Sequence, residues 1–260
     1  MESHVLKMTS NECNETTLKQ LNGFSGSSVY LIQDSDKIFV RKIGNVDRNY
    51  ERMQVLLRLG YNLPKIYNKH RDILDIEYIA GLDIKTYLRF NQPTAIIDFL
   101  ISTLRKLSAD SYDKDYSEIY IKKLNDVDFS LLPFTKLELF DKLPKILPQS
   151  IYYGDLTLEN IIYSRNREFY LIDPATIEYD SWVFDIAKLR QDLQCKWFLK
   201  HDNLFLDTKL NLIQNEIFNK FPESNNDCLL ILMLLRVFNH TERGSFEQEF
   251  LLREINKLWK

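Results

Sequence analysis

One stretch near the middle of the chain, residues 151–174, limits the possible folds more than any other part of the sequence. It reads IYYGDLTLENIIYSRNREFYLIDP and contains two short apolar runs separated by a polar turn, Ser164–Arg167. This pattern predicts a β-hairpin. Because a hairpin returns the chain to its starting end, Asn160 before the first strand and Asp173 after the second are expected to lie close together.

Asp155 lies five positions before Asn160, in the loop that leads into the hairpin. Transfer of a phosphoryl group from ATP needs such groups, since one carboxylate orients the attacking hydroxyl while an amide and a second carboxylate bind Mg²⁺. The Asp-x4-Asn spacing alone is a weak indication, because a chain rich in both residues contains roughly one such pair by chance. The flanking strands and the ending Ile-Asp-Pro strengthen it. We therefore predict that Asp155 is the catalytic base and that Asn160 and Asp173 bind Mg²⁺.

Length and composition define the general class of the protein. With 260 residues and 45% hydrophobic content, the chain can bury a large core as one large domain or two packed lobes. The net charge of −3 and the dispersed lysines argue against the basic stripe of a nucleic-acid-binding protein. The first residues lack the apolar core of a signal peptide, and the longest apolar run, 229–235, is too short to cross a bilayer. We expect a cytoplasmic protein with no nucleic-acid or membrane partner.

Cysteine and histidine give no sign of a disulfide or a metal centre. The three cysteines are widely spaced and odd in number, which favours reduced thiols in packing roles. The four histidines have no metal-ligand spacing to one another or to cysteine. We therefore expect no transition metal.

The order of predicted elements indicates an α+β fold of two lobes. Candidate strands lie near 16–22, 28–33, 37–43, 65–69 and 73–78, with one helix near 47–59. Helices are predicted at 83–108, 183–199, 207–220, 226–238 and 245–258, and two or three short helices or an insertion at 109–149. We expect a small nucleotide-binding lobe, residues 1–80, built on an antiparallel sheet with one helix. A larger, mostly helical lobe, residues 81–260, is expected to carry the catalytic loop and the substrate site.

Small residues form a turn between the first two predicted strands. The turn contains the candidate nucleotide-binding residues Gly23, Ser25, Gly26 and Ser27, which allow backbone N–H groups to approach phosphate oxygens closely. An ordinary Gly/Ser hairpin turn is the alternative, and it is favoured when the turn is considered alone.

The next strand places Ile38, Val40 and Lys42 on one face by its two-residue period. An apolar residue beneath a nucleotide base, with a lysine one step further toward the phosphates, is the kinase arrangement, so Val40 and Lys42 are candidate ATP-binding residues. A solvated strand lysine is the alternative, and Arg41 points to the opposite face. The Asp155 motif downstream favours the functional interpretation.

Two more nucleotide-binding candidates follow in the same lobe. Glu51 lies on the predicted helix, where a carboxylate usually holds the phosphate-binding lysine. A surface glutamate favoured by the helix dipole is an alternative that we weigh equally. The segment Glu77–Gly81 ends the last strand, and its Glu77 and Ile79 are expected at a hinge that presents backbone groups to adenine.

Gly154 and Asp185 bear on the conformation of the loop that carries Asp155. Gly154 gives the backbone freedom for a strained turn directly before Asp155. Asp185 begins a predicted helix, and its carboxylate is expected either to cap backbone N–H groups or to brace the catalytic loop. The sequence leaves these two roles open.

Three motifs resemble the aminoglycoside phosphotransferase and choline kinase family, the small-molecule relatives of the protein kinases. They are YGDLTLEN at 153–160, LIDP at 171–174 and DSWVFDIAKLRQDL at 180–193. The resemblance implies a two-lobed protein-kinase-like fold, ATP, Mg²⁺ and phosphorylation of a hydroxyl on a small molecule such as a sugar, an amino alcohol or an aminoglycoside. It maps the catalytic base to Asp155, the metal ligands to Asn160 and Asp173, the phosphate-binding lysine to Lys42 and its partner to Glu51. The form of the motifs looks closest to phosphotransferases of bacterial surface-polysaccharide loci.

The sequence departs from the family pattern at Tyr153, where histidine is usual. Since tyrosine cannot reproduce the imidazole hydrogen bond to the metal-binding segment, we expect the loop to be held differently. Pro174 and Ala175 replace an aromatic or acidic residue that is common in relatives, which predicts the loss of an auxiliary metal contact.

Two other functions compete with a small-molecule kinase. A protein kinase needs an activation segment ending in Ala-Pro-Glu after Asp173, and Asp180 and Asp185 follow too closely to leave room for one. A catalytically silent nucleotide-binding or scaffold protein of the same fold is the alternative from a different class. Mg²⁺-dependent turnover of ATP distinguishes it from an enzyme.

Overall fold

A computed structural model describes residues 15–21, 27–202 and 204–260 of the chain. The chain divides into two compact units. Of these described residues, the first unit comprises those up to 50 together with 64–79, and the second comprises those of 51–63 together with 80–260. The predicted division between residues 80 and 81 stays a prediction.

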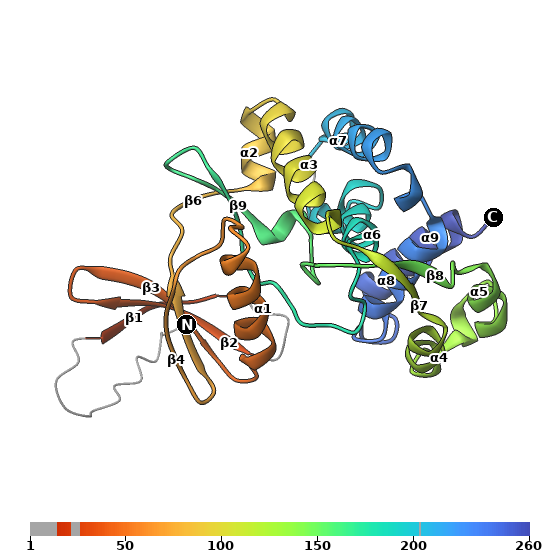
Figure 1. Ribbon diagram of the computed structural model, residues 1–260, viewed down its shortest axis with the longest axis horizontal. Coiled ribbons are helices and arrows are strands. Elements are labelled where there is room, and N and C mark those ends of the chain that lie inside the picture. The colour runs from red at the N-terminus through yellow and green to blue at the C-terminus, as the bar shows by residue number, and fades with distance from the viewer. Residues whose placement is uncertain (1–14, 22–26, 203) are drawn as a thin grey trace. The chain divides into compact units, whose positions relative to one another are not determined.

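The first unit is built on a five-stranded antiparallel sheet with the strand order β1-β2-β3-β5-β4 (Figure 1). The strands are β1 (Glu15–Leu21), β2 (Ser28–Asp34), β3 (Lys37–Ile43), β4 (Ile66–His70) and β5 (Ile73–Glu77). Every strand predicted for this region is present. Buried apolar side chains on the three central strands, such as Phe39 and Leu74, form the core of the unit.

Helix α1 (Asp47–Arg58) begins in the first unit and ends in the second. Met53 and Leu56 are buried, as the amphipathic pattern predicts. Leu59, the last residue of the predicted helix, lies beyond the helix end and is 48% exposed. The helix stops there because Gly60 adopts a φ of +73° and donates to the Leu57 carbonyl, while Tyr61 donates to the Leu56 carbonyl.

The single helix predicted at 83–108 is wrong in one respect, because the chain forms two helices there. Strand β6 (Gly81–Asp83) leads into α2 (Ile84–Phe90), and α3 (Thr94–Ser108) follows. The Asp83 carboxylate caps α2 by accepting from the Thr86 backbone N–H at 2.7 Å. The break lies at residues 91–93, where Pro93 has no N–H to continue the helical hydrogen bonds.

An inserted segment, residues 109–149, follows α3. It contains the short helices α4 (Ser117–Asn125), η1 (Phe129–Leu131) and α5 (Lys136–Lys142), in agreement with the prediction. It also contains an antiparallel ribbon of β7 (Tyr112–Asp115) and β8 (Ile146–Gln149) that the sequence did not indicate. The strand β7 reads Tyr-Asp-Lys-Asp, and β8 contains a proline, so neither has the alternating pattern of a strand.

The predicted central hairpin is present as β9 (Ile161–Ser164) and β10 (Phe169–Leu171), and β6 completes a three-stranded sheet in the order β10-β9-β6. The last part of the chain contains α6 (Trp182–Leu193), α7 (Asp207–Lys220), α8 (Asp227–Phe238) and α9 (Phe246–Leu258). The 3₁₀ helices η2 (Leu158–Asn160), η3 (Trp197–Leu199) and η4 (Pro222–Ser224) are short connections. The helix predicted at 183–199 ends early because Lys196 adopts a φ of +60°.

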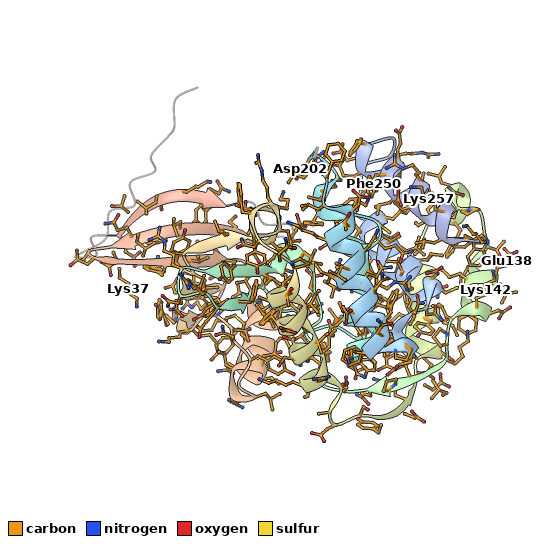
Figure 2. All side chains as sticks on the ribbon, turned by 90° about the horizontal axis from the view of Figure 1, so that it is seen from above. Lys37, Glu138, Lys142, Asp202, Phe250 and Lys257 are labelled. Carbon is orange, nitrogen blue, oxygen red and sulfur yellow. The ribbon has the colours of Figure 1, made fainter. Side chains whose placement is uncertain are left out.

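Helix α6 is the centre of the second unit. All of its residues are buried, and it contacts α3, α7 and α8. Glu138 and Lys142 of α5 lie at the edge of this unit (Figure 2). The Lys142 ammonium is 4.0 Å from the centroid of the Trp259 ring, which follows α9. The thiols of Cys195 and Cys228 are free, and Cys13 lies outside the described residues. Within the described part of the chain, no helix combines the length and the apolar character needed to span a membrane.

Candidate active site in the second unit

The residues predicted to carry the chemistry lie together in the second unit. The Asn160 side-chain amide donates to the Asp155 backbone carbonyl at 2.8 Å and to Asp155 Oδ2 at 3.0 Å. The Ile172 N–H donates to the Asn160 carbonyl at 2.9 Å, and Leu171 pairs with Ile161 across the hairpin. Asp173 therefore leaves β10 beside the point where Asn160 enters β9, as the hairpin predicts.

Two residues of this cluster have a positive backbone φ angle. Gly154 adopts a φ of +95°, and a Cβ atom at this position would lie 2.0 Å from the Ala175 carbonyl oxygen. Only glycine therefore fits before Asp155, as expected from the sequence. Asp173 adopts a φ of +60°, which an aspartate seldom occupies without a supporting environment.

Tyr153 connects the catalytic loop to the strand that leads to Asp173. Its ring is fully buried, and its hydroxyl donates a short hydrogen bond to the Ile172 carbonyl. This hydrogen bond ties the loop to the residue before Asp173, and the expected difference from a loop with histidine stays a prediction. Burial raises the pKa of Tyr153 well above its usual value, with further contributions from Asp173, Asp155 and Asp185, so the hydroxyl keeps its proton and remains a donor.

Asp185 braces the catalytic loop, which decides between its two predicted roles. Its carboxylate accepts from the backbone N–H of Tyr153 at 2.6 Å and of Gly154 at 2.7 Å. The helix cap is provided instead by Ser181, whose hydroxyl accepts from the Val183 N–H at 3.2 Å. Burial raises the pKa of Asp185 to about 7, although the two N–H donors oppose this shift.

Asp192 has a similar function two turns further along α6, and the sequence did not reveal it. Its carboxylate is fully buried and accepts from the Leu158 N–H at 2.7 Å and the Phe198 N–H at 3.2 Å. Burial raises its pKa to about 7, and Glu159 adds to the shift. The detectable signal is the spacing of seven residues between Asp185 and Asp192, which places two acids on one face of the helix.

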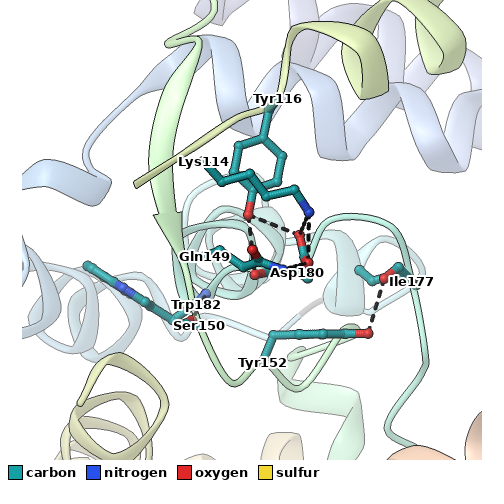
Figure 3. Close-up of polar contacts among 8 residues, drawn as sticks. All are labelled: Lys114, Tyr116, Gln149, Ser150, Tyr152, Ile177, Asp180 and Trp182. Atoms are coloured by element: carbon teal, nitrogen blue, oxygen red, sulfur yellow. Dashed lines mark hydrogen bonds and ion pairs between the residues drawn. The ribbon is translucent and has the colours of Figure 1, made fainter. Parts of the chain in front are cut away.

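A second polar network joins the inserted segment to the chain that follows Asp173 (Figure 3). The Lys114 ammonium lies 2.7 and 2.8 Å from the two carboxylate oxygens of Asp180, and the Tyr116 hydroxyl donates to one of them at 3.0 Å. Gln149 donates a short hydrogen bond to the same carboxylate. The Ser150 N–H donates to the Asp180 carbonyl at 3.0 Å, so this network also fixes the start of the catalytic segment.

In the first unit, Lys42 is 7% exposed on β3, opposite Leu74 of β5. Val40 is half-buried on the same strand and pairs with Leu31 and Ile76. Arg41 forms ion pairs with Asp75 at 2.7 Å and Glu15 at 2.6 Å. The hydrogen bond that Arg41 donates to the Asp75 carboxylate raises the pKa of Arg41 above its usual value, so this guanidinium has a structural role in the sheet.

The structure gives less information about the other nucleotide-binding candidates. Glu51 is exposed on α1. The Glu77 backbone N–H donates to the Lys65 carbonyl at 2.8 Å, and its carboxylate accepts from the Lys65 N–H at 3.1 Å. Ile79 is buried directly after β5. Ser27 precedes β2, whereas Gly23, Ser25 and Gly26 lie outside the described residues. The roles of these residues stay predictions.

A pocket of about 310 Å³ lies elsewhere in the second unit. Its lining includes Tyr61, Phe99, Lys106 and Glu168 and none of the residues predicted for catalysis, metal binding or nucleotide binding. We place the candidate active site at Asp155 rather than in this pocket, because the hydrogen-bonded carboxylate and amide groups there suit a chemical reaction.

The donor set beside Asp155 suits Mg²⁺. The Asn160 amide donates to Asp155 through Nδ2, so its Oδ1 is directed to the other side, and Asp173 at the end of the hairpin provides a carboxylate. Mg²⁺ prefers a few such oxygen ligands and keeps several waters and phosphate oxygens. Among the described residues, no group of three or more His, Cys, Asp or Glu side chains has the arrangement of a metal centre.

No protein-family model and no curated protein matches the sequence. Solved structures match the fold over nearly the whole chain. A fructosamine-3-kinase homologue from Haemophilus somnus is 16% identical with a TM-score of 0.59, covering 93% of this chain and 90% of its own. Choline kinase LicA from Streptococcus pneumoniae is 17% identical with a TM-score of 0.56, covering 92% of each chain.

A third structure is a thermostable mutant of aminoglycoside phosphotransferase APH(4)-Ia in a ternary complex with ADP and hygromycin B. It is 10% identical with a TM-score of 0.64, covering 95% of this chain and 93% of its own. These similar structures are small-molecule kinases or their homologues, and they share the antiparallel sheet and the helical part seen here. The chain therefore has the two-lobed, protein-kinase-like fold of the aminoglycoside phosphotransferase and choline kinase family.

Proposed function

We propose that the protein is an ATP- and Mg²⁺-dependent phosphotransferase that phosphorylates a hydroxyl group of a small molecule. The observation that carries this proposal is the pair of hydrogen bonds from the Asn160 amide to Asp155, beside the strand end that bears Asp173. The cluster combines a half-exposed carboxylate with two oxygen donors for a hard cation. Kinase folds use such groups to position the reactants and stabilise charge.

In the proposed reaction, the acceptor hydroxyl oxygen forms a bond to the γ-phosphorus of ATP while the bond from that phosphorus to the β–γ bridging oxygen breaks, releasing ADP. The Asp155 carboxylate orients the hydroxyl and receives its proton, which then passes to solvent. Asn160 holds Asp155 in place through Oδ2. When bound by Asn160 and Asp173, Mg²⁺ supplies neutralising charge to the phosphates.

The proposed nucleotide-binding groups are those predicted from the sequence. Lys42 is assigned to the phosphates, and Glu51 is assigned as its partner. Small residues of the turn from Gly23 to Ser27 are assigned to phosphate oxygens. The complex of a structurally similar phosphotransferase with ADP supports binding of an adenine nucleotide.

The acceptor is proposed to be a sugar, an amino alcohol or an aminoglycoside-like compound. The structurally similar proteins include a choline kinase and a phosphotransferase in complex with hygromycin B, which supports a small polar acceptor. Within this range, the motifs at 153–160, 171–174 and 180–193 favour a sugar or sugar-derived acceptor, because their form resembles phosphotransferases of bacterial surface-polysaccharide loci.

The experiment that tests this function measures ADP release from Mg²⁺-ATP with a panel of sugars, amino alcohols and aminoglycosides. We expect turnover with at least one acceptor and a fall of about 10²–10⁴-fold in Asp155→Asn, with nucleotide affinity unchanged by calorimetry. Asp141→Asn, at an exposed position of α5, is the matched control. ATP binding by the wild type without Mg²⁺-dependent turnover on any acceptor would support a catalytically silent protein instead.

A further inference from the structure

Three charged side chains of α6 contact the loop that carries Asp155. Their order along the helix matches the order of the loop residues that they contact. Asp185, Lys188 and Asp192 lie at spacings of three and four residues, on one face of the helix. Asp185 holds the backbone of Tyr153 and Gly154, and Asp192 holds the backbone of Leu158. Lys188, between them, contacts a side chain, that of Asp155.

The contact joins the Lys188 ammonium to Asp155 Oδ1 at 3.4 Å. The other oxygen, Oδ2, accepts from the Asn160 amide at 3.0 Å. Each oxygen of the proposed catalytic carboxylate therefore has its own neighbour, a cation on one side and an amide on the other. Two such contacts restrict rotation of the carboxylate about its side-chain bonds more than one contact does.

Lys188 is only 8% exposed, which is unusual for a lysine. A buried ammonium is costly unless it is paired and hydrogen-bonded. Its neighbours are Asp155, the Gln191 side-chain oxygen at 3.3 Å and the charge of Asp192 one turn away. The Asp155 side chain, by contrast, is 37% exposed, so its carboxylate is directed from a buried support toward solvent.

We propose that Lys188 is a positioning residue for phosphoryl transfer, holding the Asp155 carboxylate in the orientation that receives the acceptor hydroxyl. The proposal rests on the proposed function and adds a residue from α6 to the loop residues already described. A role confined to balancing the buried charge of Asp192 is the alternative. If Lys188 positions Asp155, the effect of replacing Lys188 on kcat depends on the presence of the Asp155 carboxylate. If Lys188 only balances Asp192, it does not.

The test compares Lys188→Met, Lys188→Arg, Asp155→Asn and the double variant Lys188→Met/Asp155→Asn. Methionine keeps most of the side-chain volume without the charge. We expect Lys188→Met to lower kcat by about 10²-fold, the loss typical of a misplaced reacting group, with KM for ATP unchanged. Lys188→Arg should recover most of this loss, and the double variant should be no slower than Asp155→Asn.

Lys257→Met is the control, because Lys257 pairs with Glu254 within α9 and has no contact with Asp155 among its ion pairs. It should match the wild type in kcat. The proposal is overturned if Lys188→Met retains kcat within twofold of the wild type. It is also overturned if kcat of the double variant is lower than that of Asp155→Asn by the same factor that Lys188→Met alone loses. Thermal unfolding of each variant establishes that all of the proteins are folded at the temperature of the assay.

A second readout is independent of catalysis. The NMR signals of the Asn160 side-chain amide, identified by their absence in Asn160→Asp, report the hydrogen bond to Asp155. They should shift in Lys188→Met and remain unchanged in Lys257→Met. If the wild type phosphorylates no acceptor but these signals shift, the proposed function fails and the positioning contact stands. Unchanged signals in Lys188→Met overturn the positioning role whatever the activity.

Discussion

The catalytic segment, residues 150–173, and the inserted segment, residues 109–149, are adjacent in sequence but are held in different ways. Buried carboxylates of α6 hold the backbone of the catalytic segment, since Asp185 is 2% exposed and Asp192 is 0% exposed. The helices of the inserted segment also use surface contacts, such as the exposed capping box of Thr135 and Glu138 and the ion pair of Lys122 with Glu178. Buried charges are costly, so their use beneath one loop indicates that its geometry is specified closely.

This comparison predicts that the largest effect comes from Gly154→Ala. The positive φ alone costs an alanine about 1–3 kcal/mol, and the added Cβ would collide with the Ala175 carbonyl, so the loop must move. We expect loss of nearly all turnover together with a lower melting temperature. Gly60→Ala is the matched control, because Gly60 also has a positive φ but has nothing within 4 Å of the added Cβ. Equal effects of the two substitutions on turnover would refute the close fit at Gly154.

The buried acids predict a second effect, on the pH dependence of stability. Because the pKa values of Asp185 and Asp192 are raised to about 7, the folded state binds more protons than the unfolded state between about pH 4 and pH 7. Their contribution to stability is therefore complete below about pH 4 and is lost as the pH rises through 7, by up to about 1.4 kcal/mol per pH unit for each acid.

Asp192→Asn removes one of these contributions and should make the decline of the unfolding free energy between pH 4 and pH 7 shallower than in the wild type. Urea unfolding at a series of pH values measures the slope. The exposed Asp141→Asn should leave the slope unchanged. A slope that is the same in Asp192→Asn and in the wild type would show that burial does not raise the pKa of Asp192.

Much of the fold and most of the proposed catalytic residues could be predicted from the sequence, because their signals are local. Strand periodicity located the sheet of the first unit, and the hairpin between Asn160 and Asp173 follows from a turn flanked by apolar runs. The contributions of Lys188 and Asp192 were missed because charged residues in a helix are usually solvent-exposed. Only tertiary packing, which buries α6 on all sides, brings these residues into contact with the loop that carries Asp155.

The β-ribbon of the inserted segment, by contrast, could not be predicted from the sequence. Its ribbon is made of β7, which is mostly charged, and β8, which contains Pro148, so neither strand has a periodic signal. Part of what fixes it is the ion pair of Lys114 with Asp180, two residues far apart in sequence. Neither stretch of sequence contains a local pattern that indicates such a long-range contact.

A smaller effect is predicted for Tyr153→Phe, which leaves the part-buried Ile172 carbonyl without its hydroxyl donor. The loss should cost about 1–3 kcal/mol of stability and lower kcat, because Ile172 directly precedes Asp173. Tyr120→Phe is the control, since the Tyr120 hydroxyl donates to the Pro144 carbonyl at 3.0 Å in the inserted segment. It should lose comparable stability without a change in kcat. A similar fall of kcat in both variants would remove the special role of Tyr153.

The smallest effect is predicted for Thr135→Ala in the inserted segment. It breaks the capping box at the start of α5 by removing the Thr135 hydroxyl, which accepts from the Glu138 N–H at 3.3 Å. We expect a loss of about 1 kcal/mol in the free energy of unfolding and no change in kcat. Thr208→Ala, at an exposed position of α7, should change neither quantity. A fall in kcat for Thr135→Ala would show that the inserted segment takes part in the reaction.

The most direct test of the account is ³¹P NMR of the protein with Mg²⁺-ATP and the acceptor panel. The account predicts a new phosphomonoester signal that grows as the γ-phosphate signal of ATP declines, and predicts its loss in Asp155→Asn. A phosphomonoester that forms at the same rate in Asp155→Asn would contradict the assignment of this carboxylate. Unchanged ATP signals with every acceptor would contradict the phosphotransferase itself.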